Sequence, residues 1–380
     1  MRAMCLVVLV LGAAHADAAS FADRLDRNPI TRPIGDALAA SVARSLPVPA
    51  ASPGVTFTFD PETHTFRRAT EVTGQLFLER AAPLGRGRRN LDLSYQWVQI
   101  DTLDGRDTDD LRDTGPPIID RHGRLFTVPR FALDLATHEV TASATYGVTD
   151  DLDVNLTLPL LESTVAVHAT ARRVVGGVPQ PGDTRGSAFA PGDLLARAKQ
   201  RLVHGAWGDL AAGLVVRMPT GNADDFQGTG TWEVAPMLYA TTPAIPVGGP
   251  VSLRGYANGG VDLDAEDVDH SEGRFGIGLD LGFGSRVTLA TAVLGREPFA
   301  APASPGFFDL LRVNPRNGRV SHAPFLGLDR GRQHFYDLAV GGRVVLWRET
   351  VIGFANVLLP LNDDGFRSDA IPMVGVEAAF

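Results

Sequence analysis

Cysteine is nearly absent from the chain. Among the 380 residues the only cysteine is Cys5, which lies in an apolar stretch at the N-terminus. Disulfide bonds, thiol catalysis and cysteine-based metal sites are therefore excluded for the rest of the sequence. Lysine is almost as rare, with Lys199 alone among many arginines, and the net charge is −9. Because no basic stripe is present, nucleic acid is not expected as a partner.

Long apolar runs are the second absence. After Ser20 no run approaches the roughly 18 residues that a membrane-spanning helix requires. Residues 1–19 resemble a secretory signal peptide, with Arg2, an apolar run from Met4 to Ala14, and two A-x-A cleavage sites that end at Ala16 and Ala18. We therefore expect an exported protein of the periplasm, the medium or the outer membrane.

Strict alternation of apolar and polar residues is what the sequence has in abundance. The clearest case is the stretch Val140–Leu160. Its apolar face carries Val140, Ala142, Ala144, Tyr146 and Val148 before a turn at 149–151, and Leu152, Val154, Leu156, Leu158 and Leu160 after it. The opposite face carries Asp153, Asn155 and Thr157. Because side chains of a strand alternate between faces, this pattern predicts a β-hairpin with one apolar and one polar surface.

The same unit recurs to the C-terminus. The expected strands are 90–100, 124–147, 151–171, 192–203, 207–218, 231–241, 251–261, 273–282, 286–296, 334–347, 350–360 and 371–380. Short turns and long polar loops alternate between them, which is typical of outer-membrane barrels. The sequence therefore predicts an all-β fold, a transmembrane antiparallel up-and-down β-barrel of about 12 strands (12–14), with both termini on the periplasmic side.

The polarity of the two faces follows from the bilayer. A sheet in hydrocarbon must close on itself, with its leucine-rich face toward lipid and its polar face toward the lumen. Strand arginines facing lipid would cost roughly 2–4 kcal/mol each at mid-bilayer, so we place them inside. The predicted lumen-lining residues are Asp153, Asn155, Arg197, Arg201, Arg217, Arg254, Asp280 and Arg343.

The ends of the mature chain differ in character. Residues 20–73 are irregular, with a short helix expected where Ile34, Leu38, Val42 and Leu46 repeat every four residues. A loosely held periplasmic arm is the preferred interpretation of this region, and a plug in the barrel mouth is the alternative. The barrel is assigned to residues 74–380. Its last residue, Phe380, ends an alternating strand, and we expect it to be the signal that the barrel assembly machinery reads.

Four segments carry a resemblance to a known family. They are GQLFLERAAPLGRGRRNLDLSYQWVQIDTLDG (74–105), YGVTDDLDVNLTLPLLES (146–163), PGDLLARAKQRL (191–202) and VVRMPTGNADDFQGTGTWEVAP (215–236). They resemble the outer-membrane protein family named for the MetA pathway of phenol degradation, over about residues 74–380. The resemblance implies a transporter-like barrel and uptake of aromatic compounds, and it supplies no catalytic residues.

Candidate chemistry is sparse. His168 with Ser163 or Thr170 has the residue types of an esterase, and Asp224-Asp225 with a distant histidine those of a carboxylate-based protease. Lumen or loop positions are the preferred interpretation of both. Acidic loops at 107–113 and 262–269 have the oxygen ligands that Ca²⁺ prefers, but no regular ligand spacing. We therefore predict no catalytic, cofactor-binding or metal-binding residues and expect no enzyme.

The predicted function is passive transport of small apolar or aromatic molecules across the outer membrane. The motivation is the barrel pattern together with the family resemblance. A non-conducting structural or interaction barrel is the first alternative, and an outer-membrane lipid hydrolase or protease the second. The expected partners are outer-membrane lipid and lipopolysaccharide, the barrel assembly machinery and a small hydrophobic solute.

Overall fold

A computed structural model gives the fold. It describes residues 77–111, 118–119, 125–173, 180–302, 304–313, 320–329, 331–347 and 350–380, together with 20–21, 23, 41–44, 46–47, 50, 57–60, 65–68 and 318. No helix in these ranges is long and apolar enough to cross a membrane.

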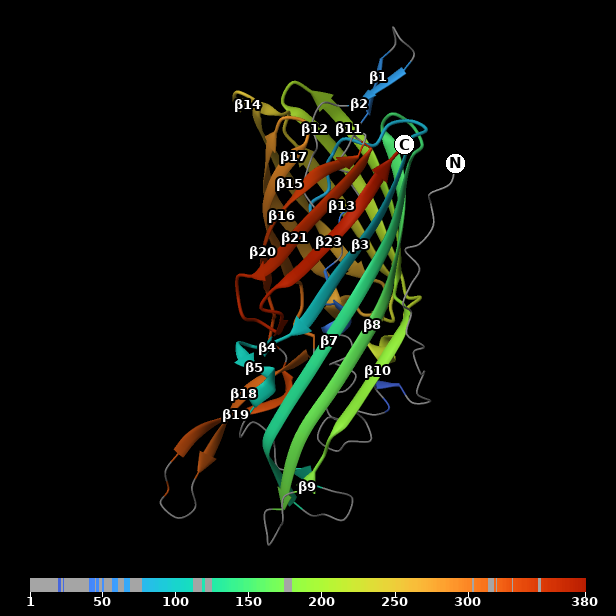
Figure 1. Cartoon of the computed structure of the whole chain (residues 1–380). Coiled ribbons are helices and arrows are strands. Elements are labelled where there is room, and N and C mark those ends of the chain that lie inside the picture. Colours follow the sequence, from blue (N-terminus) through green and yellow to red (C-terminus); the bar gives the residue numbers. More distant parts are fainter. Residues whose placement is uncertain are drawn as a thin grey trace.

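The chain forms a closed antiparallel barrel of 12 strands (Figure 1). In order around the wall these are β3 (Arg89–Ile100), β7 (Leu125–Gly147), β8 (Leu152–Arg173), β11 (Leu194–Gly205), β12 (Gly208–Met218), β13 (Glu233–Thr241), β15 (Val251–Asp264), β16 (Glu272–Phe283), β17 (Val287–Pro298), β20 (Phe335–Trp347), β21 (Val351–Pro360) and β23 (Ile371–Ala379). The last strand, β23, pairs with the first, β3, and this pairing closes the wall. The predicted fold class is therefore confirmed, and each of the twelve expected segments contains one barrel strand.

Shorter elements lie outside this wall. The structure has β1 (Phe57–Asp60), β2 (Thr65–Arg68), β4 (Thr102–Leu103), β5 (Arg106–Asp107), β6 (Ile118–Ile119), β9 (Gln180–Pro181), β10 (Thr184–Pro191), β14 (Ile245–Gly248), β18 (Ser304–Val313), β19 (Val320–Asp329), β22 (Phe366–Arg367) and the 3-10 turns η1 (Thr108–Asp110), η2 (Ala223–Asp225) and η3 (Val268–His270). The strands β7 and β8 are about twice as long as the others and project beyond the barrel, where β10 pairs with β8 (Figure 1).

The two ends of the barrel differ. Short turns join β7 to β8, β11 to β12 and β16 to β17 at one end, which we name the turn end and which also holds the C-terminus (Figure 1). The long connections and the projecting hairpin lie at the opposite end, which we name the loop end. The Phe380 backbone pairs with that of Arg89 at 2.8 and 3.1 Å, so the C-terminal residue lies directly against the first barrel strand.

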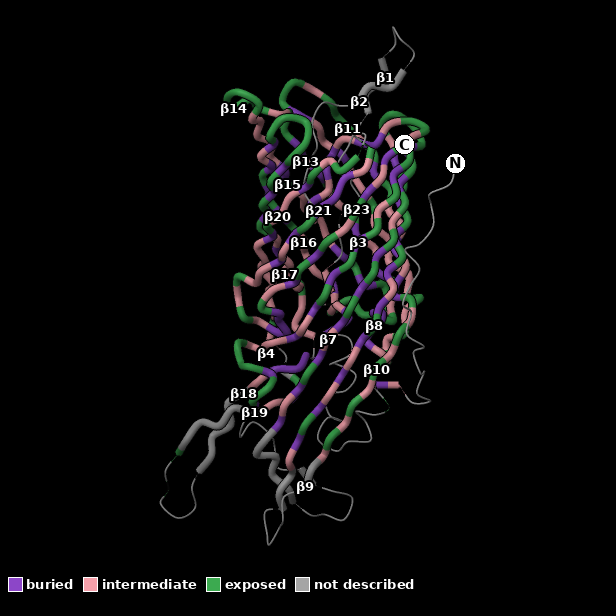
Figure 2. The backbone as a smooth tube through the Cα atoms, viewed as in Figure 1, coloured by how far each residue is buried: buried purple, intermediate pink, exposed green. Residues whose placement is uncertain are grey.

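The barrel wall is apolar outside and polar inside. Exposed and buried positions alternate along its strands (Figure 2). On β8 the outward Leu156 is 50% exposed, whereas its inward neighbour Thr157 is 2% exposed. This arrangement is the reverse of a water-soluble barrel and follows the predicted polarity. It suits a wall that faces hydrocarbon.

The polarity inverts along the long hairpin. On β7 the inward side chains at 141–145 are polar, but Phe131, Leu133 and Leu135 farther along the same face are apolar and buried. The outward-facing residues of β7 change in the opposite sense. Toward the loop end, apolar Val140 is followed by polar His138 at the next exposed outward position. Because His138 lies beside Glu162 of β8, the apolar belt ends at the same level on both strands. Beyond that level the hairpin has the polarity of a soluble protein, and its inner face joins the largest apolar cluster.

The segment 77–88 lies inside the barrel, and we name it the plug segment. The backbone N–H groups of Ala81 and Leu84 donate to Thr241 Oγ1 at 3.0 Å and to Asp153 Oδ2 at 3.1 Å. Both acceptor side chains are buried on the inner face of the wall. Earlier in the chain, residues 41–44 are helical, within the expected helix, and Leu46 lies in a bend after it. Ile34 and Leu38 of the expected helix lie outside the described residues.

Candidate functional site

A cavity of about 230 Å³ lies between the plug segment and the loop end of the barrel, and we name it the inner cavity. Its apolar lining comes from the N-terminal region, the plug segment and six wall strands. It includes Leu46, Phe77, Leu78, Val98, Ile100, Leu195, Val215, Ala235, Met237, Leu294 and Leu358. Phe77 and Leu78 belong to the plug segment, so the plug forms part of the cavity wall. The position of the plug therefore determines the shape of the space.

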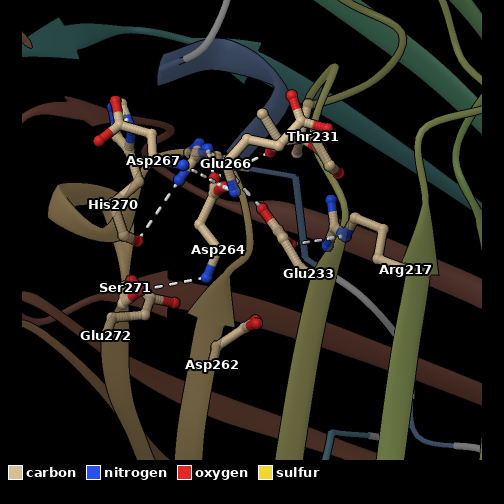
Figure 3. A network of polar contacts seen from close by, with 12 residues as sticks. Arg217, Thr231, Glu233, Asp262, Asp264, Glu266, Asp267, His270, Ser271 and Glu272 are labelled. Atoms are coloured by element: carbon tan, nitrogen blue, oxygen red, sulfur yellow. Dashed lines mark hydrogen bonds and ion pairs between the residues drawn. The ribbon is translucent and has the colours of Figure 1, made fainter.

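A group of charged side chains closes the inner cavity toward the loop end, and we name it the charged ring. Its members are Arg44, Arg217, Glu233, Asp262, Asp264, Glu272, Arg274 and Arg296. Figure 3 shows the acidic members and Arg217 converging from neighbouring strands. Arg217 Nε lies 3.0 Å from Glu233 Oε2, and Arg274 Nη2 lies 2.6 Å from Asp262 Oδ2. The wall arginines of the charged ring are therefore paired with carboxylates of the wall itself.

Arg44 is the member of the charged ring that does not belong to the wall. Its Nη2 atom lies 2.7 Å from Asp264 Oδ2, and its Nη1 atom donates to the His270 carbonyl oxygen at 3.4 Å. The Arg44 carbonyl oxygen accepts a hydrogen bond from Arg296 Nη1 at 2.9 Å. Side chain and backbone of the N-terminal region are thus both fixed to the barrel at this level.

A second cavity, of about 380 Å³, lies on the other side of the charged ring, and we name it the vestibule. It shares the charged residues Arg44, Glu233, Asp262, Arg274 and Arg296, together with Phe366, with the inner cavity. The two spaces are therefore neighbours separated by charged side chains. Arg44, which is held by Asp264 and the His270 carbonyl oxygen, is one of the side chains at this boundary.

His270 lies beside this boundary, on η3 and outside the barrel strands. Burial lowers the pKa of its ring, and the positive charge of Arg44 lowers it further, although Asp267 and Asp264 act in the opposite direction. The ring is consequently held neutral to a lower pH than a free histidine. Protonation would place a second cation beside Arg44.

Most of the predicted lumen-lining residues are held in polar contacts. Asp153, Asn155, Asp280 and Arg343 are at most 6% exposed. Asp280 accepts a hydrogen bond from the Tyr256 hydroxyl at 2.5 Å, and Arg343 Nη1 lies 2.7 Å from Glu377 Oε2. These contacts fill the lumen near the plug segment and away from the inner cavity.

The remaining predicted residues lie at different levels. Arg197 and Arg217 line the inner cavity, and Arg197 Nη1 donates to Asn155 and Thr157 at 3.0 and 2.8 Å. Arg254 is half-buried and lies opposite Asp280 on the next strand. Arg201 lies at the turn end, at a bulge of β11, where it binds the exposed Asp151 at 2.6 Å. Contact of any of these side chains with a solute stays a prediction.

The structure does not bring the candidate catalytic residues together. Ser163 is buried on the inner face of β8 beside Thr137, whereas His168 is exposed on the outer face and lies 3.4 Å from Asp183. Asp225 accepts hydrogen bonds from the Phe21 backbone N–H at 2.8 Å and from the Asn222 amide at 2.6 Å. Within the described ranges, no group of His, Cys, Asp or Glu side chains is arranged to hold a metal ion.

Several important residues escaped the sequence-based prediction. The sequence pattern places Asp262 and Asp264 in an acidic loop, but both are buried at the end of β15 and pair with arginines. Their alternation in step with Asn258 was a signal that could have placed them on the inner face. No comparable pattern marks Arg44 or Glu79, which lie outside the alternating segments.

Comparison with known proteins adds little beyond the fold. No family model and no curated protein matches the chain. An outer-membrane channel from Pseudomonas putida F1 is 14% identical, with a TM-score of 0.44, over 79% of this chain and 98% of that one. The toluene transporter TbuX of Ralstonia pickettii is 10% identical (TM-score 0.31; 78% and 90%), and the outer-membrane protease OmpT of Escherichia coli 8% identical (TM-score 0.26; 77% and 96%). At such low similarity no activity is transferred to this chain.

Proposed function

We propose that this protein is an outer-membrane β-barrel through which small apolar or aromatic molecules pass by diffusion. The observation that carries the proposal is the inner cavity, whose accessible lining is mainly apolar and which adjoins a vestibule at the loop end. No cofactor or energy input enters the proposal, because passage follows the concentration gradient of the solute.

The dimensions of the apolar belt support the membrane location. On β7 the belt runs from Val140 to Gly147, and on β8 from Leu152 to Leu160. These lengths are close to the 9–11 residues that a tilted transmembrane strand needs. A closed wall leaves no strand edge in hydrocarbon, since every strand has two neighbours. In this proposal the turn end faces the periplasm and the loop end faces the exterior.

The size of the inner cavity supports a small solute. An apolar protein cavity of about 150 Å³ accepts benzene. The inner cavity, at about 230 Å³, has room for a single aromatic ring with one substituent. Larger solutes would require the plug segment to move.

The plug segment favours a second candidate, a structural barrel that conducts nothing. It fills the lumen on the turn side of the cavity, and the Gly87 N–H donates to the Gly147 carbonyl oxygen at 2.7 Å. Passage therefore requires either displacement of residues 77–88 or an opening between wall strands. A structural barrel would require neither.

Solute flux distinguishes the two candidates. The refolded protein is placed in liposomes with lipopolysaccharide in the outer leaflet, and the entry of a small aromatic alcohol is followed by swelling. Transport predicts faster swelling than in protein-free liposomes. It predicts a further increase when residues 21–68 are deleted, because the deletion removes Arg44 from the boundary between the two cavities and leaves the plug segment as the remaining obstacle. Identical swelling with the full chain, the deletion variant and no protein would rule the transport proposal out.

A further inference from the structure

We infer that the inner cavity is a binding site for a small aromatic or apolar molecule that carries one carboxylate, and that Glu79 of the plug segment occupies its anion position in the structure described here. The inference rests on the proposed function and narrows its solute class. A bound carboxylate would take the place of the Glu79 carboxylate beside Arg197 and Lys199.

Glu79 lies where a ligand carboxylate would be held. Its side chain lines the inner cavity and is 12% exposed, and its Oε2 atom lies 3.6 Å from Lys199 Nζ. Arg197 lines the same cavity and interacts electrostatically with Glu79. Lys199 does not line the cavity. The plug segment therefore presents a carboxylate from the cavity side to two cations of the β11 wall.

The cations keep other partners when Glu79 leaves. Lys199 Nζ lies 3.6 Å from Asp153 Oδ2, and Arg197 Nη1 donates to the neutral oxygens of Asn155 and Thr157. Exchange of one carboxylate for another therefore leaves no isolated charge in the wall. An uncharged solute offers no such exchange, because it would leave the Glu79 carboxylate in place.

The backbone of Glu79 is fixed independently of its side chain. In the amide orientation that satisfies both groups, Asn258 accepts from the Glu79 N–H at 2.6 Å and donates to the Glu79 carbonyl oxygen at 3.0 Å. Two residues farther on, the Ala81 N–H is bound by Thr241. The Glu79 side chain can thus rotate away from Lys199 while the plug segment stays in the barrel.

The rest of the cavity suits the apolar part of such a ligand. Phe77 and Leu78 immediately precede Glu79 in sequence, and Leu195 precedes Arg197 by two residues on the same face of β11. Met237 and Ala235 line the cavity from β13. A ring placed among these side chains leaves its carboxylate directed toward the Glu79 position.

The test uses benzoate and benzamide, which have nearly the same shape and differ in charge. Binding to the full-length refolded protein is measured by equilibrium dialysis for the wild type, Glu79→Gln and Arg197→Gln, with Glu162→Gln on the exposed outer face as the matched control. We expect Glu79→Gln to tighten benzoate binding by about tenfold or more, because a competing like charge is removed. Benzamide binding should stay unchanged, and Arg197→Gln should abolish the preference for benzoate.

Equal gains for benzoate and benzamide in Glu79→Gln would overturn the inference, since the variant would then only have enlarged the space. Unchanged benzoate binding would overturn it as well. If Glu79→Gln does not fold into a heat-modifiable barrel, Glu79→Asp replaces it. That variant withdraws the carboxylate by one methylene group. Its affinity for benzoate is expected to exceed that of the wild type, by less than the tenfold expected for Glu79→Gln.

The flux measurement separates this inference from the proposed function. Transport of a neutral aromatic alcohol without benzoate binding overturns the carboxylate site and leaves the proposed function standing. Benzoate binding as expected, without flux of either solute, supports the site and overturns transport.

Discussion

Single residues on β8 can be used to locate the part of the wall that faces lipid. Leu156 lies within the apolar belt and is half exposed, whereas Ala166 faces the same side of the strand beyond the level where the polarity inverts. Leu156→Arg should therefore destabilise the barrel by about 2–4 kcal/mol, and Ala166→Arg by less than about 0.5 kcal/mol. Urea unfolding of the protein in phospholipid vesicles measures both. Equal costs would show that the belt is placed at the wrong level.

The second residue-scale prediction concerns pH. Burial and Arg44 lower the pKa of His270, so the unfolded chain binds this proton at a higher pH than the folded protein does. The contribution of the neutral ring is present above the ordinary histidine pKa and is lost as the pH falls from there toward the folded value. We expect the unfolding midpoint to fall over this window, and His270→Gln to flatten the profile. An unchanged slope in His270→Gln would contradict this role.

The sequence was informative about residues within strands and uninformative about residues outside them. Asp153 and Arg217 lie in alternating segments, where one decision about the lipid-facing side fixes the direction of every side chain. Arg44 and Glu79 lie in segments without such a pattern, and the contacts that position them come from distant strands. Local periodicity carries no information about such contacts.

At the scale of elements, the plug segment packs closely against the end of the wall strand β7. A Cβ atom added to Gly147 of β7 would lie 1.8 Å from the Gly85 carbonyl oxygen, whereas one added to Gly259 would meet nothing within 4 Å. Gly147→Ala should therefore cost about 1–3 kcal/mol through overpacking, and Gly259→Ala much less. Comparison of their urea midpoints checks this. Equal midpoints would mean that the plug segment is not seated against β7.

The elements differ in how far the sequence predicts them. The twelve wall strands were predicted because each has one lipid-facing and one lumen-facing side over many residues. β10 was missed because TRGSAFAP contains mostly small residues and little apolar contrast. The inversion along β7 and β8 was missed because an alternating pattern alone does not say which face is buried. Only the neighbours of a strand determine that.

At the scale of the whole molecule, the barrel contains four successive regions. A vestibule at the loop end leads to the charged ring, the inner cavity lies beneath the ring, and the plug segment fills the lumen toward the turn end. A route through these regions must use the inner cavity. A side chain that fills the cavity should therefore block passage without altering the outer surface.

Uptake by cells tests this most directly. Initial uptake of a radiolabelled aromatic solute is compared for Gram-negative cells that express no barrel, the wild type, Ala235→Trp in the inner cavity, or Ala142→Trp on the lipid-facing side of β7. The account predicts that the wild type and Ala142→Trp raise uptake equally and that Ala235→Trp returns it to the level of cells without the barrel. Uptake that is the same for all four strains, or unaffected by Ala235→Trp, would contradict it.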